Sequence, residues 1–164
     1  MLKIHDYVNY GASGVCEITE IKKERVRGVT KEYYILRPVF AENSAIYVPL
    51  DNETLVGKIR PVISPRELDS IIADAEKRCD QWIENDNERT EKYRETLKSG
   101  NRSEIIEILR VIYRRQKELI SRGKHLHVTD ERIRREAQTP LCSEIAFVKH
   151  ITPDEALTLI LTNL

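Results

Sequence analysis

The chain has 164 residues, enough for one domain of ordinary size or two small ones. Lys plus Arg and Asp plus Glu number 27 each, so the net charge is zero and indicates no class of partner. No apolar run approaches the roughly 20 residues that cross a bilayer, and the cysteines Cys16, Cys79 and Cys142 are far apart. We therefore expect a soluble, cytoplasmic protein with reduced thiols.

Residues 1–62 have the pattern of a small all-β domain. Pro38 and Pro49 cannot donate a hydrogen bond within a sheet, so we expect their strands to lie at an edge or to carry a bulge. Short strands with closely spaced turns predict a small SH3-like or Tudor-like barrel, whose exposed edges are natural docking sites for a partner's strand. The predicted strands, rich in β-branched and aromatic residues, are 5–10, 15–21, 32–40 and 45–50.

Residues 63–164 predict a compact all-α domain of about five helices, which makes the fold class α+β. The clearest helix starts are the capping boxes Ser64-Pro65-Arg66-Glu67 and Thr152-Pro153-Asp154-Glu155, each with proline at the first helical position. A polar helix is predicted at 81–98, and Thr129 is predicted to cap a later helix. Pro140 either kinks that later helix or starts a new one.

The central helix is predicted from Asn101 to Arg122. Gly100 suits the left-handed position after a helix end, and Asn101 can cap the next helix, with Glu104 reaching back. Apolar residues follow at helical spacing, so this helix should contribute a wide face to the core.

Positive charge is concentrated in the segment from Arg89 to Arg135. This segment contains fourteen Lys and Arg residues and only seven Asp and Glu residues. Such a local excess is typical of surfaces that bind phosphate, although the alternative is an ordinary solvated helix surface. Among the possible phosphate-contacting residues we prefer Arg114, Arg115 and Lys124, because few acids lie near them. The full set of predicted phosphate contacts is Arg89, Arg94, Lys98, Arg114, Arg115, Lys117, Arg122 and Lys124.

No catalytic motif is found: there is no P-loop, GxGxxG, GxSxG or paired-carboxylate pattern. His125 and His127 could ligate a metal, but no neighbouring Cys, Asp or Glu completes a familiar spacing. We therefore expect no enzymatic activity, no metal and no cofactor.

Short motifs are spread over nearly the whole chain. They are Asp6-Tyr7-Val8-Asn9-Tyr10-Gly11-x-x-Gly14-Val15, Lys31-Glu32-Tyr33-Tyr34-x-Leu36, Ile46-Tyr47-Val48-Pro49-x-Asp51-Asn52, Gly57-x-x-Arg60, Leu97-Lys98-Ser99-Gly100-Asn101, Lys124-x-Leu126 and Ser143-Glu144-Ile145-Ala146. In order and spacing they resemble the CarD family of bacterial transcription regulators.

The resemblance implies a Tudor-like N-terminal domain, shared with transcription-repair coupling factor, that binds the β subunit of RNA polymerase by extending a sheet. The helical domain would contact promoter DNA at the upstream edge of the melted bubble, without reading sequence, and stabilise the open complex. The polymerase contacts implied here lie in 25–35 and 46–48: Arg25, Arg27, Tyr33, Tyr34, Ile35, Ile46, Tyr47 and Val48.

Trp82, the only tryptophan, has two interpretations. Family members place a tryptophan against the minor groove as a wedge, which predicts that Trp82 contacts DNA. Trp82 precedes the matching position, which is Asp86 here, by about one helical turn. The alternative is an anchor between helices.

Two other functions remain open. An adaptor on RNA polymerase without DNA contact would show no salt-dependent DNA binding, whereas a metal-dependent enzyme would use His125 and His127. The expected partners are the RNA polymerase β subunit and promoter DNA, with no membrane. We expect a monomer, with a strand-swapped dimer as the alternative.

Overall fold

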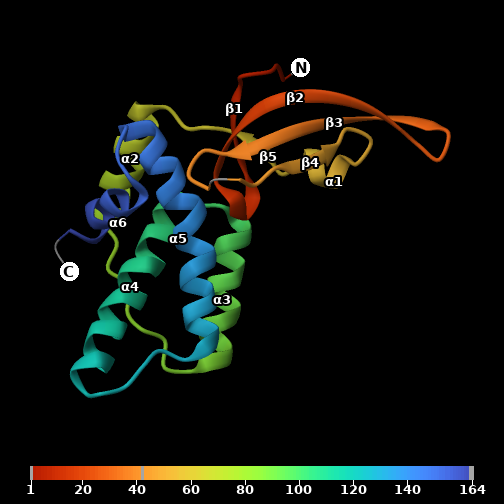
Figure 1. Cartoon of the computed structure of the whole chain (residues 1–164). Coiled ribbons are helices and arrows are strands. Elements are labelled where there is room, and N and C mark those ends of the chain that lie inside the picture. The colour runs from red at the N-terminus through yellow and green to blue at the C-terminus, as the bar shows by residue number, and fades with distance from the viewer. Residues whose placement is uncertain (1, 42, 163–164) are drawn as a thin grey trace.

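Five strands form one antiparallel sheet in the order β4-β3-β2-β1-β5. The computed structural model describes residues 2–41 and 43–162 (Figure 1). Within them β4 and β5 do not pair, so the sheet is open and does not form the closed barrel that the sequence predicted. Both outer strands are short and end in proline, which has no N–H for a further ladder. The strands are β1 (Tyr7–Tyr10), β2 (Val15–Val26), β3 (Val29–Pro38), β4 (Ile46–Pro49) and β5 (Ile59–Pro61).

The hairpin of β2 and β3 is the longest feature of the sheet. Its turn consists of Arg27 and Gly28, whose φ angles are 51° and 83°, the positive values of a type I′ turn. β4 pairs with β3 only from Tyr33 to Leu36. The end of the hairpin therefore projects beyond the sheet and away from the helices (Figure 1).

The prolines lie largely as expected. β4, which ends at Pro49, is an edge strand. β3 is an inner strand, but Pro38 is its last residue and lies beyond the stretch that β4 covers. Two short elements escaped prediction because they are too brief to show a period: α1 (Glu53–Val56) and β5. The sheet core consists of Val8, Cys16, Ile18, Tyr34, Leu36 and Val48.

The helical part has two apolar clusters, and α4 contributes to both. α4 is therefore the central core helix that the sequence predicted. The larger cluster includes Leu68, Ile106, Leu109, Leu141, Ile145 and Ile160, and the smaller one includes Tyr93, Ile108, Ile112 and Ile133.

No helix among the described residues is long and apolar enough to cross a membrane. The helices are α2 (Pro65–Glu76), α3 (Asp86–Ser99), α4 (Arg102–Ser121), α5 (Val128–Lys149) and α6 (Pro153–Leu161).

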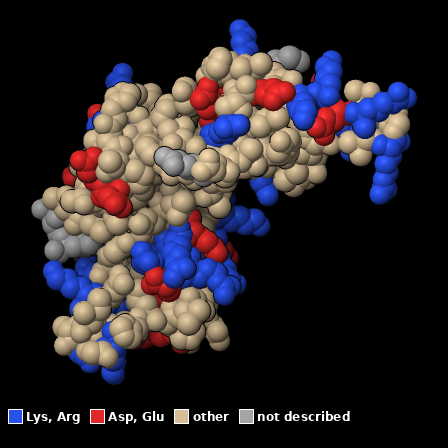
Figure 2. All heavy atoms as spheres, viewed as in Figure 1, with Lys and Arg blue, Asp and Glu red and all other residues tan. Residues whose placement is uncertain are grey.

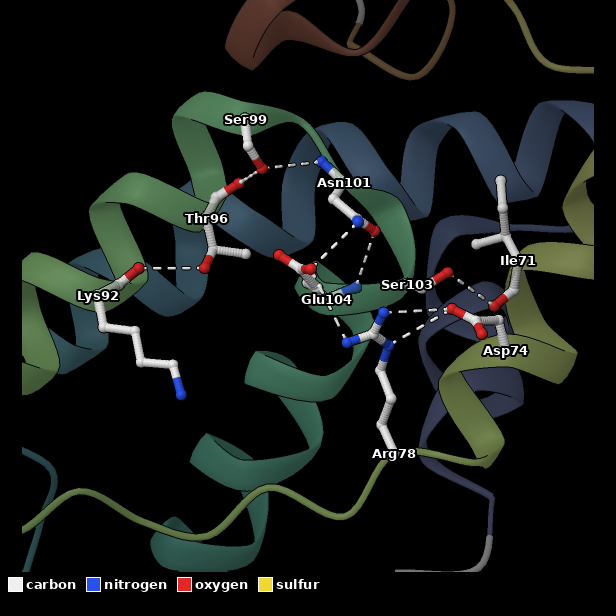
Figure 3. Close-up of polar contacts among 9 residues, drawn as sticks. All are labelled: Ile71, Asp74, Arg78, Lys92, Thr96, Ser99, Asn101, Ser103 and Glu104. Atoms are coloured by element: carbon white, nitrogen blue, oxygen red, sulfur yellow. Dashed lines mark hydrogen bonds and ion pairs between the residues drawn. The ribbon is translucent and has the colours of Figure 1, made fainter.

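The corner between α3 and α4 lies at the predicted residues, with the Gly100 turn and the Asn101 cap confirmed and the Glu104 contact made to the Asn101 side chain instead of its N–H (Figure 3). Gly100 adopts a left-handed φ of 71°, and the Asn101 side chain accepts the N–H of Glu104 at 3.3 Å. The Glu104 carboxylate reaches back to the Asn101 side-chain amide at 3.2 Å. The Ser99 hydroxyl accepts the Asn101 N–H at 3.2 Å, which closes the turn.

Two predicted helix boundaries were wrong. α3 begins at Asp86 rather than at residue 81, because Asn85 accepts the N–H groups of Asn87 and Glu88 and thereby caps the helix. Trp82 consequently lies in the segment before α3. α5 is capped by His127 rather than by Thr129, because the His127 ring nitrogen accepts the Thr129 N–H at 3.3 Å. Of the two alternatives for Pro140, the start of a new helix is wrong, since α5 runs through this residue without a break.

The sheet joins the helices mainly along α5. The N–H of Val15 donates to the Ser143 hydroxyl at 2.9 Å in a buried hydrogen bond, and the N–H of Ile63 donates to the Glu144 carboxylate at 3.2 Å. The rings of Tyr7 and Phe147 lie 4.8 Å apart. The contact is close, because a Cβ on Gly14 would lie 2.5 Å from the Ser143 side chain.

Gly14→Ala should lower the free energy of unfolding by about 2–5 kcal/mol. Gly14 has φ 73° and ψ −145°, a conformation that costs other residues about 1–3 kcal/mol, and the added methyl would overpack the junction. Urea denaturation measures the change. The matched control is Gly28→Ala, which has a φ of 83° but open space, and should cost only about 1–2 kcal/mol. Equal losses would contradict the crowding at Ser143.

Candidate docking edge and basic surface

The outer side of β4 is an edge with no strand beside it in the described residues. Its pairing with β3 is regular, with Ile35 opposite Tyr47 and Leu36 opposite Ile46. Tyr47 belongs to this edge strand and is 54% exposed. An edge that carries an exposed aromatic residue can accept a partner's strand through main-chain hydrogen bonds and hold it by a side-chain contact.

The predicted docking residues fall into three groups by burial: buried, half-buried and exposed. Tyr34 and Val48 belong to the sheet core, and Ile35 is also buried. Their side chains are therefore withdrawn from any partner. Tyr33 and Ile46 are half-buried. Among the predicted docking residues, Arg25, Arg27 and Tyr47 are exposed.

The end of the β2–β3 hairpin carries Lys and Arg side chains with acids beside them (Figure 2). Lys23 pairs with Glu32 at 2.7 Å, and Lys31 pairs with Asp51 at 2.8 Å. Arg25 and Arg27 form no ion pair within the described residues. The two arginines are therefore cations at the end of this hairpin that remain available to an acidic partner.

Arg89 was predicted to contact phosphate, but its side chain is only 3% exposed. Its guanidinium donates two hydrogen bonds of 2.8 Å to Asp130 and one of 2.7 Å to Asp86. Burial lowers the pKa of the Arg89 guanidinium, but the bonds to both carboxylates outweigh this and raise it. The same contact lowers the pKa of Asp86. Arg89 is a structural residue, and a phosphate cannot reach it without breaking these bonds.

Trp82 is half-buried beside the smaller apolar cluster of the helices. The Arg89 guanidinium lies 4.1 Å from the centre of its ring, and that of Arg115 lies 5.4 Å away. Cation–π contacts of this kind are worth about 0.5–2 kcal/mol each. The neighbouring Tyr93 is buried, which raises its pKa to about 12. In this arrangement Trp82 covers the start of α3.

Arg115 is also engaged. Its guanidinium lies 3.3 Å from Glu118 and 3.7 Å from Glu84, and its side chain is 24% exposed. Glu84 precedes α3, so this pairing links elements that are separate in the sequence. Arg115 was one of the three preferred phosphate contacts, and its charge is largely compensated.

The remaining predicted phosphate contacts are exposed and form no ion pair within residues 2–41 and 43–162. They divide into two groups. Arg94 and Lys98 lie on α3, whose C-terminal end meets the sheet, whereas the second group lies at the C-terminal end of α4, far from the sheet (Figure 1). This second group is named the α4-end patch and consists of Arg114, Lys117, Arg122 and Lys124.

Several residues that shape these surfaces were not predicted. Asp130 neutralises Arg89, and Glu144 accepts two hydrogen bonds from Arg102, at 2.6 and 2.9 Å. Both acids are separated from their partners by about forty residues. Ser143 and Glu144 were noted only within a family motif, and no local pattern indicates that they hold the sheet.

Comparison with protein families assigns both parts of the chain. Residues 2–63 match the CarD-like/TRCF RID domain, and residues 71–161 match the CarD C-terminal domain. The first match places the chain in the class of RNA polymerase-interacting transcription regulators, since this domain binds the polymerase β subunit. The chain belongs to the CarD family, which confirms the resemblance predicted from its motifs.

Asp130→Asn should destabilise the protein by about 3–5 kcal/mol, because it leaves the buried Arg89 guanidinium without its main counterion. Chemical denaturation followed by tryptophan fluorescence measures the change. The matched control is Asp69→Asn, which breaks the ion pair between Asp69 and Lys149. The Asp69 side chain is 63% exposed, so this variant should lose less than about 1 kcal/mol of stability. Similar losses in both variants would contradict the structural role of Arg89.

Proposed function

We propose that this protein docks on the β subunit of RNA polymerase through the outer edge of β4 and contacts promoter DNA through its helices, and that it thereby changes the stability of the open complex. It acts as a monomer and carries out no chemical reaction. The single observation that supports docking best is the unpaired β4 edge with its exposed Tyr47, within the part of the chain that matches the polymerase-interacting domain.

In this proposal a strand of the β subunit extends the sheet beside β4. Main-chain hydrogen bonds supply affinity and Tyr47 supplies a side-chain contact. Arg25 and Arg27, unpaired in the described part of the chain, would meet acidic groups on the polymerase. Tyr34, Ile35 and Val48 contribute only by keeping β3 and β4 in place, because they are buried.

The α4-end patch is the DNA-contacting surface of this proposal. Its four cations are exposed and unpaired in the described residues, and they lie at the end of the helices that is far from the sheet (Figure 1). A few phosphate contacts give weak, sequence-independent affinity. Docking on the polymerase would compensate for this by raising the effective concentration of the helices near the promoter.

For Trp82 we propose the anchor role rather than the wedge. Its ring is half-buried and lies beside two guanidinium groups, so inserting it between base pairs would expose the smaller apolar cluster. The second candidate function, an adaptor without DNA contact, draws support from the compensated charges of Arg89 and Arg115.

Tyr47→Asp should reduce capture of RNA polymerase core by the full-length protein at least tenfold, because it places a carboxylate where an apolar strand contact is proposed. Pull-down at several protein concentrations gives the change in affinity. Leu159→Asp is the control, since it alters another exposed apolar residue, 39% exposed, on α6. Unchanged capture by the Tyr47 variant would refute docking at β4.

The triple variant Arg114→Gln, Lys117→Gln, Lys124→Gln should weaken binding to forked DNA and reduce the salt dependence. The slope of log K against log salt is negative, and each lost phosphate contact reduces its magnitude by about 0.7–0.9. Fluorescence anisotropy between low and moderate salt measures the slope. A charge-matched control removes the exposed cations Lys3, Arg66 and Lys77. If both triples change the slope equally, the patch is not the contact, and if the parent protein shows no slope, the adaptor function is favoured.

A further inference from the structure

A cleft of about 550 Å³ lies between the sheet and the helices. The sheet side contributes the β1–β2 turn and the segment from α1 to β5. The helical side contributes the α3–α4 corner and the middle of α5 around Pro140. The volume falls in the range of small-molecule sites, which is about 300–1,000 Å³. The β4 edge and the α4-end patch of the proposed function do not include this cleft, although Lys98 in its lining was also among the predicted phosphate contacts.

The floor of the cleft is apolar. Both halves of the chain contribute to it, which makes it a property of their packing and not of either sequence segment alone. An apolar floor favours a ligand with a flat or hydrophobic body. The residues that form it are Ala12, Leu97, Ile105, Ala137, Pro140 and Leu141.

The rim of the cleft is positively charged. Lys58 and Arg60 come from the sheet side and Lys98 from α3, and none of the three forms an ion pair within the described residues. The charges of Arg102 and Glu144 cancel each other in a direct pair of 2.6 Å. Of the lining acids only Glu136 then remains, so the rim has an excess of two positive charges.

Arg60 connects the two sides. Its Nη1 atom lies 3.6 Å from the position that a Cβ on Gly100 would occupy. It thus reaches from β5 to the α3–α4 corner, next to the first residues of α4. The positive end of that helix adds to the attraction for an anion.

We propose that this cleft binds a small organic phosphate of the nucleotide class. The base would lie on the apolar floor, and the phosphates would pair with Arg60, Lys98 and Lys58 at the rim. Charge-assisted hydrogen bonds of this type contribute about 1.5–3 kcal/mol each. Because both halves of the chain line the site, the ligand would stabilise their observed packing by mass action. The proposal is independent of the polymerase and DNA contacts.

Isothermal titration calorimetry on the full-length protein tests the proposal, with ADP and GDP as probes and with adenosine and pyrophosphate as their separate parts. We expect saturable binding of one nucleotide per chain, with either part binding at least tenfold more weakly. The variant Arg60→Gln, Lys98→Gln should weaken nucleotide binding at least tenfold, which is about 1.4 kcal/mol. The charge-matched control Arg66→Gln, Lys77→Gln should bind as the parent does, and thermal unfolding without ligand checks that both variants fold.

Three outcomes would overturn the proposal. One is the absence of saturable nucleotide binding, and another is an equal loss in the cleft variant and the control. The third is pyrophosphate binding as tightly as the nucleotides, because the floor would then have no role. Forked DNA is titrated in parallel: if the cleft variant loses affinity for DNA and no nucleotide binds, the rim belongs to the DNA surface instead. Failure of this site leaves the polymerase and DNA experiments unaffected.

Discussion

The packing of the sheet on the helices depends on one buried carboxylate. Glu144 is 2% exposed and accepts hydrogen bonds from the Arg102 guanidinium and from the N–H of Ile63. It therefore joins the C-terminal part of α5 to the start of α4 and to the segment that leaves the sheet. A buried charge is tolerated only when it is paired and hydrogen-bonded, so these partners cannot move apart without cost. The Val15–Ser143 bond next to it completes the junction.

This junction determines how the proposed contacts are arranged in space. The β2–β3 hairpin projects on one side of the molecule, and the C-terminal end of α4 lies far from it (Figure 1). The hydrogen bonds of the junction hold the two parts together, which would give the α4-end patch a defined position once the sheet is docked as proposed. The weak DNA contacts that we propose would become useful under that condition, because they would act within a tethered complex. The same junction creates the cleft whose rim contains Arg60 and Lys98.

The candidate surfaces could be predicted only in part. The excess of positive charge between Arg89 and Arg135 is visible in the sequence, and so is the proline-marked strand that becomes the β4 edge. Which cations are available is not visible. Arg89 and Asp130 are 41 residues apart in the chain and form a buried pair, and Arg115 is compensated by Glu84 from before α3. Charge counting over a window cannot distinguish these residues from Arg114 or Lys117.

The sequence by itself determined what depends on neighbouring residues. Helix starts at Ser64, Asn101 and Thr152, the left-handed Gly100 and the turn at Gly28 follow from side-chain capping and allowed φ values, which are local properties. Family membership also followed, since it depends on the order and spacing of short motifs. The Asn85 cap that leaves Trp82 outside α3 is local as well, although the helix was predicted to begin earlier. Tertiary structure alone decided that the sheet stays open, that α5 continues through Pro140, and which charges are paired. These features result from contacts between residues far apart in the chain, whose energies no local pattern contains.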